Sequence, residues 1–307
     1  MPADTDALLT IRDFIRWGAS RFDEADLYFG HGTDNALDES AQLVLAALHL
    51  APDLPPMYLD ARLTPGEREQ VLALLRRRLE ERLPAPYLTH KTWFAGIEFY
   101  LDERVLVPRS PLAELIEGRF EPWVVADQLD RVLDLCTGGG CIGLATALHL
   151  PEVRVDLADI SGPALEVARH NLARYRLQDR VETIQSDLFQ ALAGRRYDLI
   201  LCNPPYVDAQ DLAALPPEYH REPLLGLAGG ADGLDLVRPI LANAVEFLEP
   251  GGTLIVEVGN SAEALMEQFP QVPWVWLEFE RGGDGVFLLT REQLQEFHTL
   301  FVEASNP

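Results

Sequence analysis

Short apolar runs alternate with stretches of helical periodicity from Pro108 onward, and this alternation limits the folds that the chain can adopt. Runs of this length, bounded by turn residues, are typical of buried strands. The expected strands cover residues 132–136, 153–158, 181–184, 197–202 and, after a Pro-Gly-Gly turn at 250–252, 253–258. Residues 274–280 and 286–290 flank a glycine-rich turn as a closing hairpin. The sequence therefore predicts an α/β fold, with a doubly wound Rossmann-like sheet that has an antiparallel end.

Residues 1–90 lack strand alternation, and their apolar residues repeat at helical spacing. A capping box with proline at the first helical position, Thr-Pro-Gly-Glu at 64–67, opens the third of these helices. Pro84 and Pro86 are expected to end it. The three apolar series are Leu8, Ile11 and Ile15; Leu37, Ala41, Val44 and Leu48; and Val71, Leu75 and Leu79. The sequence predicts a small N-terminal helical domain, either a docking module for a substrate or a lid.

The boundary between the two predicted domains lies before Pro108. Residues 93–107 alternate loosely in polarity, so a hairpin is expected to link the domains. The predicted organisation is a helical domain over 1–90, a hairpin linker over 91–108 and a sheet-bearing domain over 109–307.

The segment Asn203-Pro204-Pro205-Tyr206 directly follows the predicted strand 197–202. Two consecutive prolines remove two backbone donors and fix two φ angles, so the chain leaves the sheet stiffly at an edge where open α/β sheets bind ligands. The Asn203 side-chain oxygen and the Pro204 carbonyl can each accept one N–H of a planar –NH2 group, while Tyr206 lies against its face. The segment is predicted to hold an amide or exocyclic amine whose nitrogen attacks an electrophile. An ordinary Asn-Pro turn is the alternative.

A glycine-rich turn, Thr-Gly-Gly-Gly at 137–140, follows the strand that ends at Cys136. Its glycines allow a ligand to approach the backbone closely, and the helix that follows offers free N–H groups. Asp159, at the end of the next strand, is placed to accept hydrogen bonds from ribose hydroxyls. Asp187 can accept from an adenine amino group while Leu188 covers the ring. These strand ends together predict a nucleoside pocket.

The same turn fits the Gly-x-Gly-x-x-Gly fingerprint at Gly138, Gly140 and Gly143, so a nicotinamide-dependent dehydrogenase is an alternative. No Gly-Lys-Ser/Thr follows the glycines, which argues against a P-loop nucleotidase. Asp134, on the strand before them, would repel a pyrophosphate and suits a cationic or amino-bearing ligand. S-adenosylmethionine carries an ammonium and a sulfonium group and no phosphate. The two motifs together therefore predict methyl transfer.

The formal net charge of the chain is −24, and Lys91 is its only lysine. Such a negative field repels nucleic-acid phosphates and attracts a basic partner, so direct DNA binding is not expected. A solvated acidic surface that serves solubility alone is the alternative.

The three cysteines and seven histidines show no disulfide framework and no metal-ligand spacing, so no metal site is predicted. Cys136 and Cys202 would end neighbouring strands, where a small buried apolar role is favoured over a catalytic thiol. No apolar stretch approaches the ~20 residues that cross a bilayer. The first residues contain no basic segment before an apolar one. A cytoplasmic protein without a membrane partner is expected.

The pairing of Asp-Leu-Cys-Thr-Gly-Gly-Gly-Cys-Ile at 134–142 with the Asn203 segment resembles the HemK-like protein glutamine N5-methyltransferases. The chain is most similar to the branch that methylates the third protein of the large ribosomal subunit. The closer match lies in residues 105–116, 218–228, 232–238, 276–279 and 282–287. The release-factor branch usually has Pro-Arg-Pro-Glu-Thr where this chain has Pro-Arg-Ser-Pro at 108–111. Gly139 stands where the family commonly has serine or threonine, which removes one hydroxyl near the cofactor.

The resemblance implies a Rossmann-like methyltransferase that uses S-adenosylmethionine to methylate a glutamine side-chain nitrogen in a basic ribosomal protein. A peptide release factor is the alternative substrate. Adenine N6-methylation is less favoured, because such enzymes need a basic groove for the nucleic acid. A cofactor-binding subunit without activity predicts a damaged reactive turn, and here the turn is intact. The candidate catalytic residues are Asn203, Pro204, Pro205 and Tyr206, and the candidate cofactor-binding residues are Asp134, Cys136, Thr137, Gly138, Gly139, Gly140, Asp159, Asp187, Leu188 and Asn203.

A long connection runs from Tyr206 to Asp232, directly after the reactive turn. Loops placed there generally select the substrate. Glu218 and Glu222 are candidates for holding the peptide around the target glutamine, and salt bridges within the loop are the alternative. Arg109 is a third candidate for substrate binding, with a tie between the linker and the loop carboxylates as its alternative.

Overall fold

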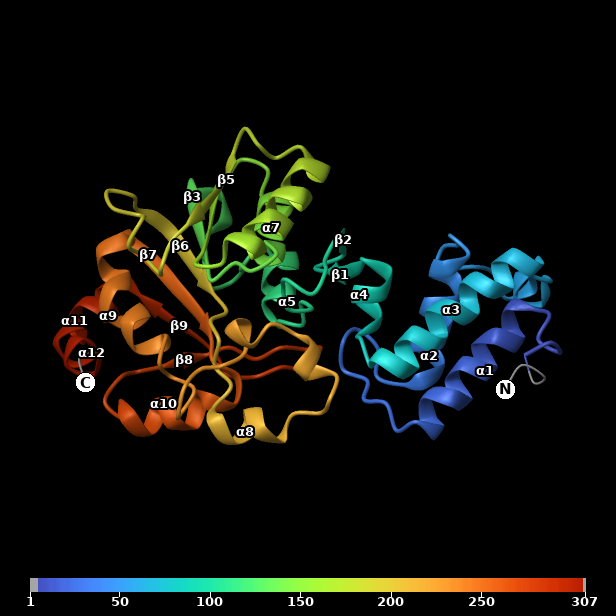
Figure 1. Cartoon of the computed structure of the whole chain (residues 1–307). Helices are drawn as coiled ribbons and strands as arrows, with labels where there is room; N and C mark the ends of the chain where they lie inside the picture. The colour runs from blue at the N-terminus through green and yellow to red at the C-terminus, as the bar shows by residue number, and fades with distance from the viewer. Residues whose placement is uncertain (1–4, 306–307) are drawn as a thin grey trace. The chain divides into compact units, whose positions relative to one another are not determined.

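The computed structural model describes residues 5–305, so the first residues, from which the lack of a leader was inferred, lie outside the described part. The described chain forms two compact units. One consists of the residues through Thr92 together with Leu101–Glu103 and Pro216–Glu222, and the other holds the remaining segments. The first unit is helical and the second carries a large sheet (Figure 1).

The helical unit contains α1 (Ile11–Glu24), α2 (Ala36–Ala47), a 3-10 turn η1 (Pro56–Asp60), α3 (Pro65–Glu81) and α4 (Ala85–Thr89). The predicted capping box opens α3: the Thr64 side chain accepts from the Glu67 N–H, and the Glu67 carboxylate accepts from the Thr64 N–H at 2.7 Å. The helix ends at Glu81, before either proline. Pro84 and Pro86 instead lie at the start of α4, where a missing N–H costs nothing.

The buried face of α2 differs from the predicted one. Leu37 is 56% exposed, and the buried residues are Ala36, Glu39, Ser40, Leu43, Val44 and Leu45. Glu39 and Ser40 can face the core because each has a partner there. The Ser40 hydroxyl donates to the Ile15 carbonyl at 2.9 Å, and Glu39 pairs with the Arg78 guanidinium. The prediction failed because an apolar count cannot recognise polar residues that are satisfied by distant groups.

The sheet-bearing unit contains a seven-stranded sheet in the order β5-β4-β3-β6-β7-β9-β8. Its strands are β3 (Arg131–Leu135), β4 (Arg154–Asp159), β5 (Val181–Gln185), β6 (Tyr197–Cys202), β7 (Leu248–Glu257), β8 (Val275–Trp276) and β9 (Val286–Thr290). The first five in this order are parallel, whereas β9 pairs antiparallel with both β7 and β8. The predicted doubly wound sheet with an antiparallel end is confirmed. A separate two-stranded sheet joins β1 (Thr92–Phe94) to β2 (Ile97–Phe99).

One detail of the sheet was not expected. The Pro-Gly-Gly turn at 250–252 lies inside β7 instead of preceding it. Tyr197 pairs with Leu248 but Leu199 pairs with Thr253, so the intervening residues form an irregularity in the pairing. Gly251 supplies the positive φ of 80° that this irregularity needs.

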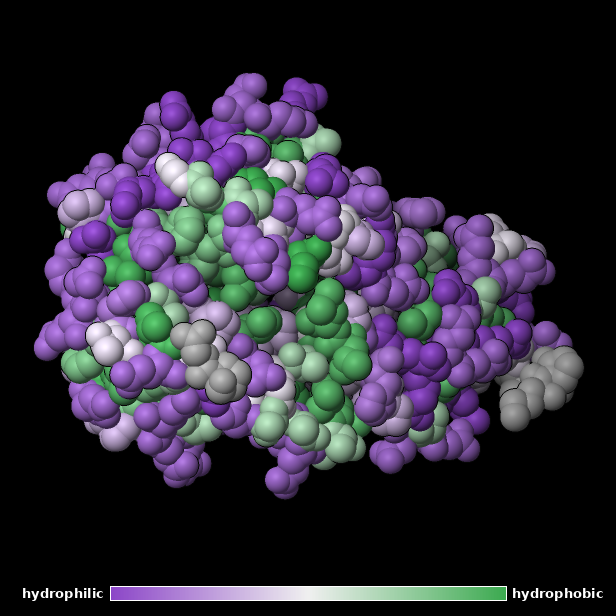
Figure 2. Space-filling view, turned by 60° about the vertical axis from the view of Figure 1, so that its left-hand side comes forward, coloured by the Kyte–Doolittle hydropathy of each residue, from purple (hydrophilic) through white to green (hydrophobic). Residues whose placement is uncertain are grey.

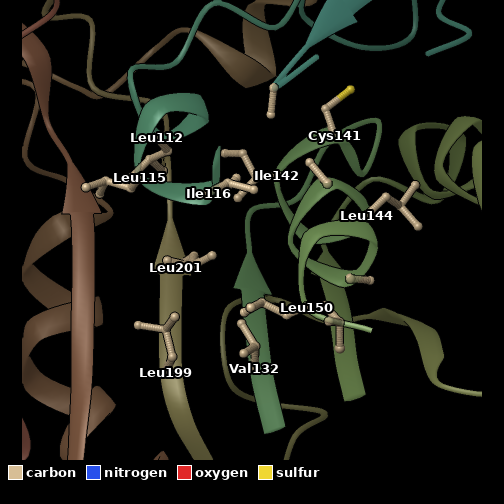
Figure 3. Packing of buried hydrophobic residues seen from close by; sticks show 14 of the residues in the cluster. Leu112, Leu115, Ile116, Val132, Cys141, Ile142, Leu144, Leu150, Leu199 and Leu201 are labelled. Carbon is tan, nitrogen blue, oxygen red and sulfur yellow. The ribbon is translucent and has the colours of Figure 1, made fainter. Parts of the chain in front are cut away.

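Helices cover both faces of the sheet, so its strands are buried on both sides. One cluster packs α5 (Leu112–Glu117), α6 (Cys141–His149) and α7 (Gly162–Tyr175) on the sheet; Figure 3 shows α5 side chains gathered with Ile142 of α6 and Leu201 of β6. A second cluster packs α9 (Val237–Phe247), α10 (Ala262–Gln268), α11 (Arg291–Glu296) and α12 (His298–Ser305) on the sheet. The remaining elements are α8 (Ala209–Ala214), η2 (Ala126–Gln128), η3 (Tyr219–Arg221), η4 (Leu224–Gly226) and η5 (Gly259–Ser261).

Hydrophilic residues cover most of the face seen in Figure 2. Within residues 5–305, no helix combines the length and apolar character needed to cross a membrane. The large apolar side chains are mostly gathered in three buried clusters, two around the sheet and one in the helical unit.

Candidate active site

The candidate site is built at the carboxyl ends of three adjacent strands. Leu135 of β3 pairs with Ala158 of β4 on one side and with Cys202 of β6 on the other. Because the strands are parallel and in register, the residues that follow them emerge at the same edge of the sheet. The glycine turn, Asp159 and Asn203 are thereby brought together although up to 66 positions separate them in sequence.

Asp159 holds the glycine turn directly. Its Oδ2 accepts from the Gly138 N–H and its Oδ1 accepts from the Ser161 N–H, both at 2.8 Å. Burial raises the pKa of Asp159, and these backbone donors oppose the shift. The Ile160 N–H is a third backbone donor to this carboxylate, which has about four acceptor positions. Hydrogen bonds from ribose hydroxyls to Asp159 stay a prediction.

Asp134 is fully buried, and its two oxygens have different surroundings. Oδ2 accepts from the Thr137 hydroxyl and, at 2.8 Å, from the Gly143 N–H. Oδ1 is buried without a hydrogen-bond partner, and burial raises the pKa of Asp134 to about 7. A buried orphan acceptor points to a missing donor. Gly138 in the turn that follows has a φ of 54° and open space where a Cβ would stand, so a ligand can approach the backbone there. An amino-bearing ligand therefore fits this turn.

The other predicted cofactor residues lie around the same edge. Cys136 and Gly139 are half-buried and Gly140 is buried. Asp187 is exposed, with its Oδ2 accepting from the Gln190 amide at 2.8 Å. Leu188 is half-buried at a φ of 46°, and the Ser186 hydroxyl donates to its carbonyl at 2.6 Å. Their contact with a cofactor remains a prediction.

Asn171 on α7 supports the glycine turn and was missed by sequence reasoning. Its side-chain N–H group donates to the Tyr100 carbonyl at 2.9 Å and to the Gly139 carbonyl at 3.3 Å. Its oxygen accepts from the Tyr100 N–H at 2.8 Å. The only signal in the sequence was one amide residue on the buried face of a helix, which does not reveal its partners.

The reactive turn follows β6. Glu257 of β7, the strand on the side of β6 opposite β3, holds this turn. Asn203 is half-buried, and both prolines are buried. The Tyr206 hydroxyl donates to Glu257 Oε1 at 2.9 Å, and the Ser110 hydroxyl donates to Oε2 at 2.5 Å. A Cβ on Gly259, which has a φ of 46°, would come within 2.6 Å of the Tyr206 ring. The ring is thus fixed by a hydrogen bond at its tip and by backbone against its edge.

Sequence reasoning also missed Glu257. It is 4% exposed, and burial raises its pKa while the Ser110 and Tyr206 hydroxyls oppose that shift. The available signal was a lone carboxylate inside the apolar run 253–258. Charged residues are rarely buried without partners, so such a position predicts a polar contact but not its identity.

The three candidate substrate-binding residues have different surroundings. Arg109 is exposed and donates to the Val107 carbonyl at 3.2 Å. Its positive charge lowers the pKa of Tyr206 and of Glu257, but burial has the larger effect and raises both pKa values. Glu218 and Glu222 are buried in the helical unit beside basic side chains. Glu218 pairs with Arg78 and Arg82, and Glu222 lies beside His31, so these partners lie outside the loop and not within it as the alternative supposed. A contact of either glutamate with the substrate stays a prediction.

The three thiols are free. Cys136 directly follows β3, and Cys202 is the last residue of the neighbouring strand β6, as expected. Burial raises the pKa of the Cys202 thiol, which disfavours the thiolate that a nucleophile requires. Residues 5–305 contain no group of three or more potential ligands that could hold a metal ion.

Comparison with known proteins identifies the family. Residues 123–215 match the model of the methyltransferase small domain. Ribosomal protein uL3 glutamine methyltransferases of Neisseria gonorrhoeae and of Neisseria meningitidis serogroup B are each 52% identical to the chain over 289 residues. The alignments cover 94% of this chain and 96% and 95% of those proteins.

A solved structure supports the fold independently. The hMettl16 catalytic domain, crystallised with MAT2A 3'UTR hairpin 6, superposes with a TM-score of 0.51 at 19% identity. The superposed residues make up 74% of this chain and 81% of the hMettl16 chain. This likeness concerns the methyltransferase fold alone, whereas the 52% identity extends over nearly the whole chain. By its sequence, its sheet and its reactive turn, the chain belongs to the family of ribosomal protein uL3 glutamine methyltransferases.

Proposed function

We propose that this protein transfers a methyl group from S-adenosylmethionine to the side-chain nitrogen of a glutamine in ribosomal protein uL3. The observation that carries the proposal is the pairing of Leu135 with Cys202 in a chain 52% identical to curated enzymes named for this activity. That register sets the turn suited to a planar amide beside the turn suited to an amino-bearing nucleoside.

The cofactor would lie along the ends of β3, β4 and β5. Asp159 would accept from its ribose hydroxyls, the free Oδ1 of Asp134 from its amino group, and Asp187 from its adenine. When bound, S-adenosylmethionine supplies a methyl group on a sulfonium, which is electrophilic.

The chain's own contribution to the reaction is to orient a weak nucleophile. An amide nitrogen is a poor nucleophile because its lone pair is delocalised into the carbonyl. Asn203 Oδ1 and the Pro204 carbonyl would each accept one of its N–H bonds, which aims the nitrogen and stabilises the positive charge that develops there. Tyr206, held by Glu257, would cover the flat face of the amide. The reactive turn contains no base, so the proton leaves to water after methylation.

The charge of the chain suits the proposed partner. Basic ribosomal proteins would be attracted to a chain of net charge −24, and the association rate should fall as salt rises. Because the substrate is a ribosomal protein, we place the reaction in the cytoplasm.

The test of the proposal is a comparison of substrates. The protein is incubated with methyl-labelled S-adenosylmethionine and, separately, with free uL3, a peptide release factor and DNA. Mass spectrometry then locates the label. We expect N5-methylglutamine in uL3 alone. Label in the release factor would keep the chemistry and overturn the substrate, and label in DNA alone would overturn both.

Replacing Glu257 by glutamine is expected to lower kcat/KM for uL3 about tenfold, because Tyr206 loses its carboxylate acceptor. The affinity for S-adenosylmethionine should stay within about twofold, measured by calorimetry. Tyr206→Phe removes the other end of the same hydrogen bond, so the double variant should be little worse than Glu257→Gln alone. Effects that multiply would show that the two groups act separately.

Cofactor affinity should depend on pH through Asp134. With its pKa raised to about 7, the carboxyl is mostly neutral at pH 6 and mostly ionised at pH 8. A cationic ligand binds the ionised form, so the Kd for S-adenosylmethionine should tighten up to about tenfold across that range. Asp134→Asn should bind more weakly with a flat profile. A wild-type Kd that does not change with pH would remove Asp134 from contact with the ligand's amino group.

A further inference from the structure

The connection that follows the reactive turn contributes one segment, Pro216–Glu222, to the helical unit. We infer that a buried ion-pair cluster centred on Arg78 anchors this segment, and that the helical unit thereby positions the substrate loop 207–232. The inference rests on the proposed function only in that its kinetic readout is uL3 methylation.

Arg78 is the centre of the cluster. Its side chain is fully buried on α3, where its Nε donates to Glu39 Oε1 of α2 at 2.6 Å and its Nη2 donates to the Tyr28 carbonyl at 3.0 Å. Its Nη1 lies 3.6 Å from Glu218 Oε1, and the same oxygen lies 2.9 Å from Arg82 Nη2. Two buried carboxylates therefore surround the buried Arg78 guanidinium, and the partly exposed Arg82 guanidinium reaches one of them.

The charge balance makes the segment part of the helical unit's core. A buried charge is tolerated only beside a partner, and removing one member of a buried pair costs far more than removing a surface pair. Glu39 alone would supply one carboxylate for two guanidinium groups, the buried Arg78 and the partly exposed Arg82. Glu218 supplies the second carboxylate from a position 136 residues beyond Arg82 in sequence.

Two further contacts fix the direction of the segment. The Tyr219 ring packs against Tyr28 and His31, with ring centroids 5.6 and 4.6 Å apart. Glu222 Oε2 lies 3.4 Å from His31 Nε2. Contacts at 218, 219 and 222 prevent the segment from sliding along its own axis.

The far end of the same loop is tied to the reactive turn. Val207, the residue after Tyr206, donates its N–H to the Leu227 carbonyl at 2.9 Å and accepts from the Gly229 N–H at 2.8 Å. The loop is thus held on both sides of η4 (Leu224–Gly226). Backbone pairing to Val207 holds the side after it, and the contacts of Glu218, Tyr219 and Glu222 hold the side before it. Releasing the anchor at 218 should loosen the loop without touching the cofactor turn.

Glu218 is accordingly a positioning residue, and Glu39 provides its matched control. Both are buried, and both pair with Arg78, but only Glu218 belongs to the loop. Glu218→Gln and Glu39→Gln each remove one negative charge from the same cluster and keep the shape of the side chain. A merely structural role of the cluster predicts the same effect for both variants.

The experiment compares the two variants in the full-length protein by hydrogen–deuterium exchange, steady-state kinetics and calorimetry. We expect Glu218→Gln to increase amide exchange across 207–232 and to lower kcat/KM for uL3 about fivefold or more, with the Kd for S-adenosylmethionine within about twofold. Glu39→Gln should increase exchange in α2 and α3 and leave that of 207–232 unchanged. Equal exchange and kinetics in the two variants would overturn the inference.

Two provisions keep the result decisive. If Glu218→Gln does not fold, Arg82→Gln takes its place. This variant removes a partly exposed partner of Glu218 and should produce the same pattern more weakly. Exchange is measured without substrate, so it reports on the anchor even if the wild-type protein fails to methylate uL3. Failure of methylation would contradict the proposed function, whereas unchanged loop exchange in a folded Glu218 or Arg82 variant would contradict the anchor.

Discussion

Replacing Asn203 by alanine is expected to lower kcat for uL3 methylation about 100- to 1000-fold. The expectation follows from the proposed role of the side-chain oxygen as an acceptor for one of the two N–H bonds of the target amide. Removing one such preorganised group from an active site costs about this much in other enzymes. The side chain is half-buried beside the cofactor edge, so water would replace the lost acceptor only in poor geometry. Single-turnover assays with labelled cofactor measure the effect directly.

Two controls separate chemistry from folding in this variant. The Kd for S-adenosylmethionine, measured by calorimetry, should remain within about twofold of wild type, because Asn203 does not hold the glycine turn. Asn243→Ala, which removes an exposed amide from α9, should leave turnover unchanged. A near wild-type rate in Asn203→Ala would contradict the acceptor model.

Replacing Asp159 by alanine is expected to weaken the binding of S-adenosylmethionine about 100-fold. The proposed hydrogen bonds between the carboxylate and ribose hydroxyls would account for most of this loss. The rest comes from the Gly138 and Ser161 N–H groups, which lose their acceptor when the carboxylate is removed. At saturating cofactor, turnover should fall only a few-fold. Calorimetry and a cofactor titration of the initial rate measure the two quantities.

Asp159→Asn is the matched variant for this prediction. It preserves the size of the side chain and one acceptor oxygen, so its Kd should lie between those of wild type and the alanine variant. An unchanged Kd in Asp159→Ala would remove this residue from the cofactor pocket.

The cofactor edge of the sheet was largely predictable because its signals are local. Each strand is a short apolar run, and the residue that follows it is identified by counting. The parallel register then follows from the alternation of strands and helices. The strand ends at Cys136, Asp159 and Asn203 therefore lie together as predicted.

The groups that support the site were not predictable in the same way. Glu257 could be singled out as a charge in an apolar strand, but its partners Ser110 and Tyr206 lie 147 and 51 positions away. Asn171 holds the glycine turn from a different helix. Hydrogen bonds of this kind depend on the final packing and leave no periodic pattern in the sequence.

The helical unit shows the same limit most clearly. Its capping box at Thr64 was predicted, because every atom of that motif lies within one helical turn. The buried face of α2 and the place of Glu218 were not predicted, because they depend on the Ile15 carbonyl and on the charges of Arg78 and Arg82. The sequence by itself determined the order of the strands, the start of α3 and the reactive turn, whose causes are local sterics and apolar periodicity. Only the tertiary structure decided which buried charges meet, because a carboxylate becomes tolerable in the core when a guanidinium group from a distant segment reaches it.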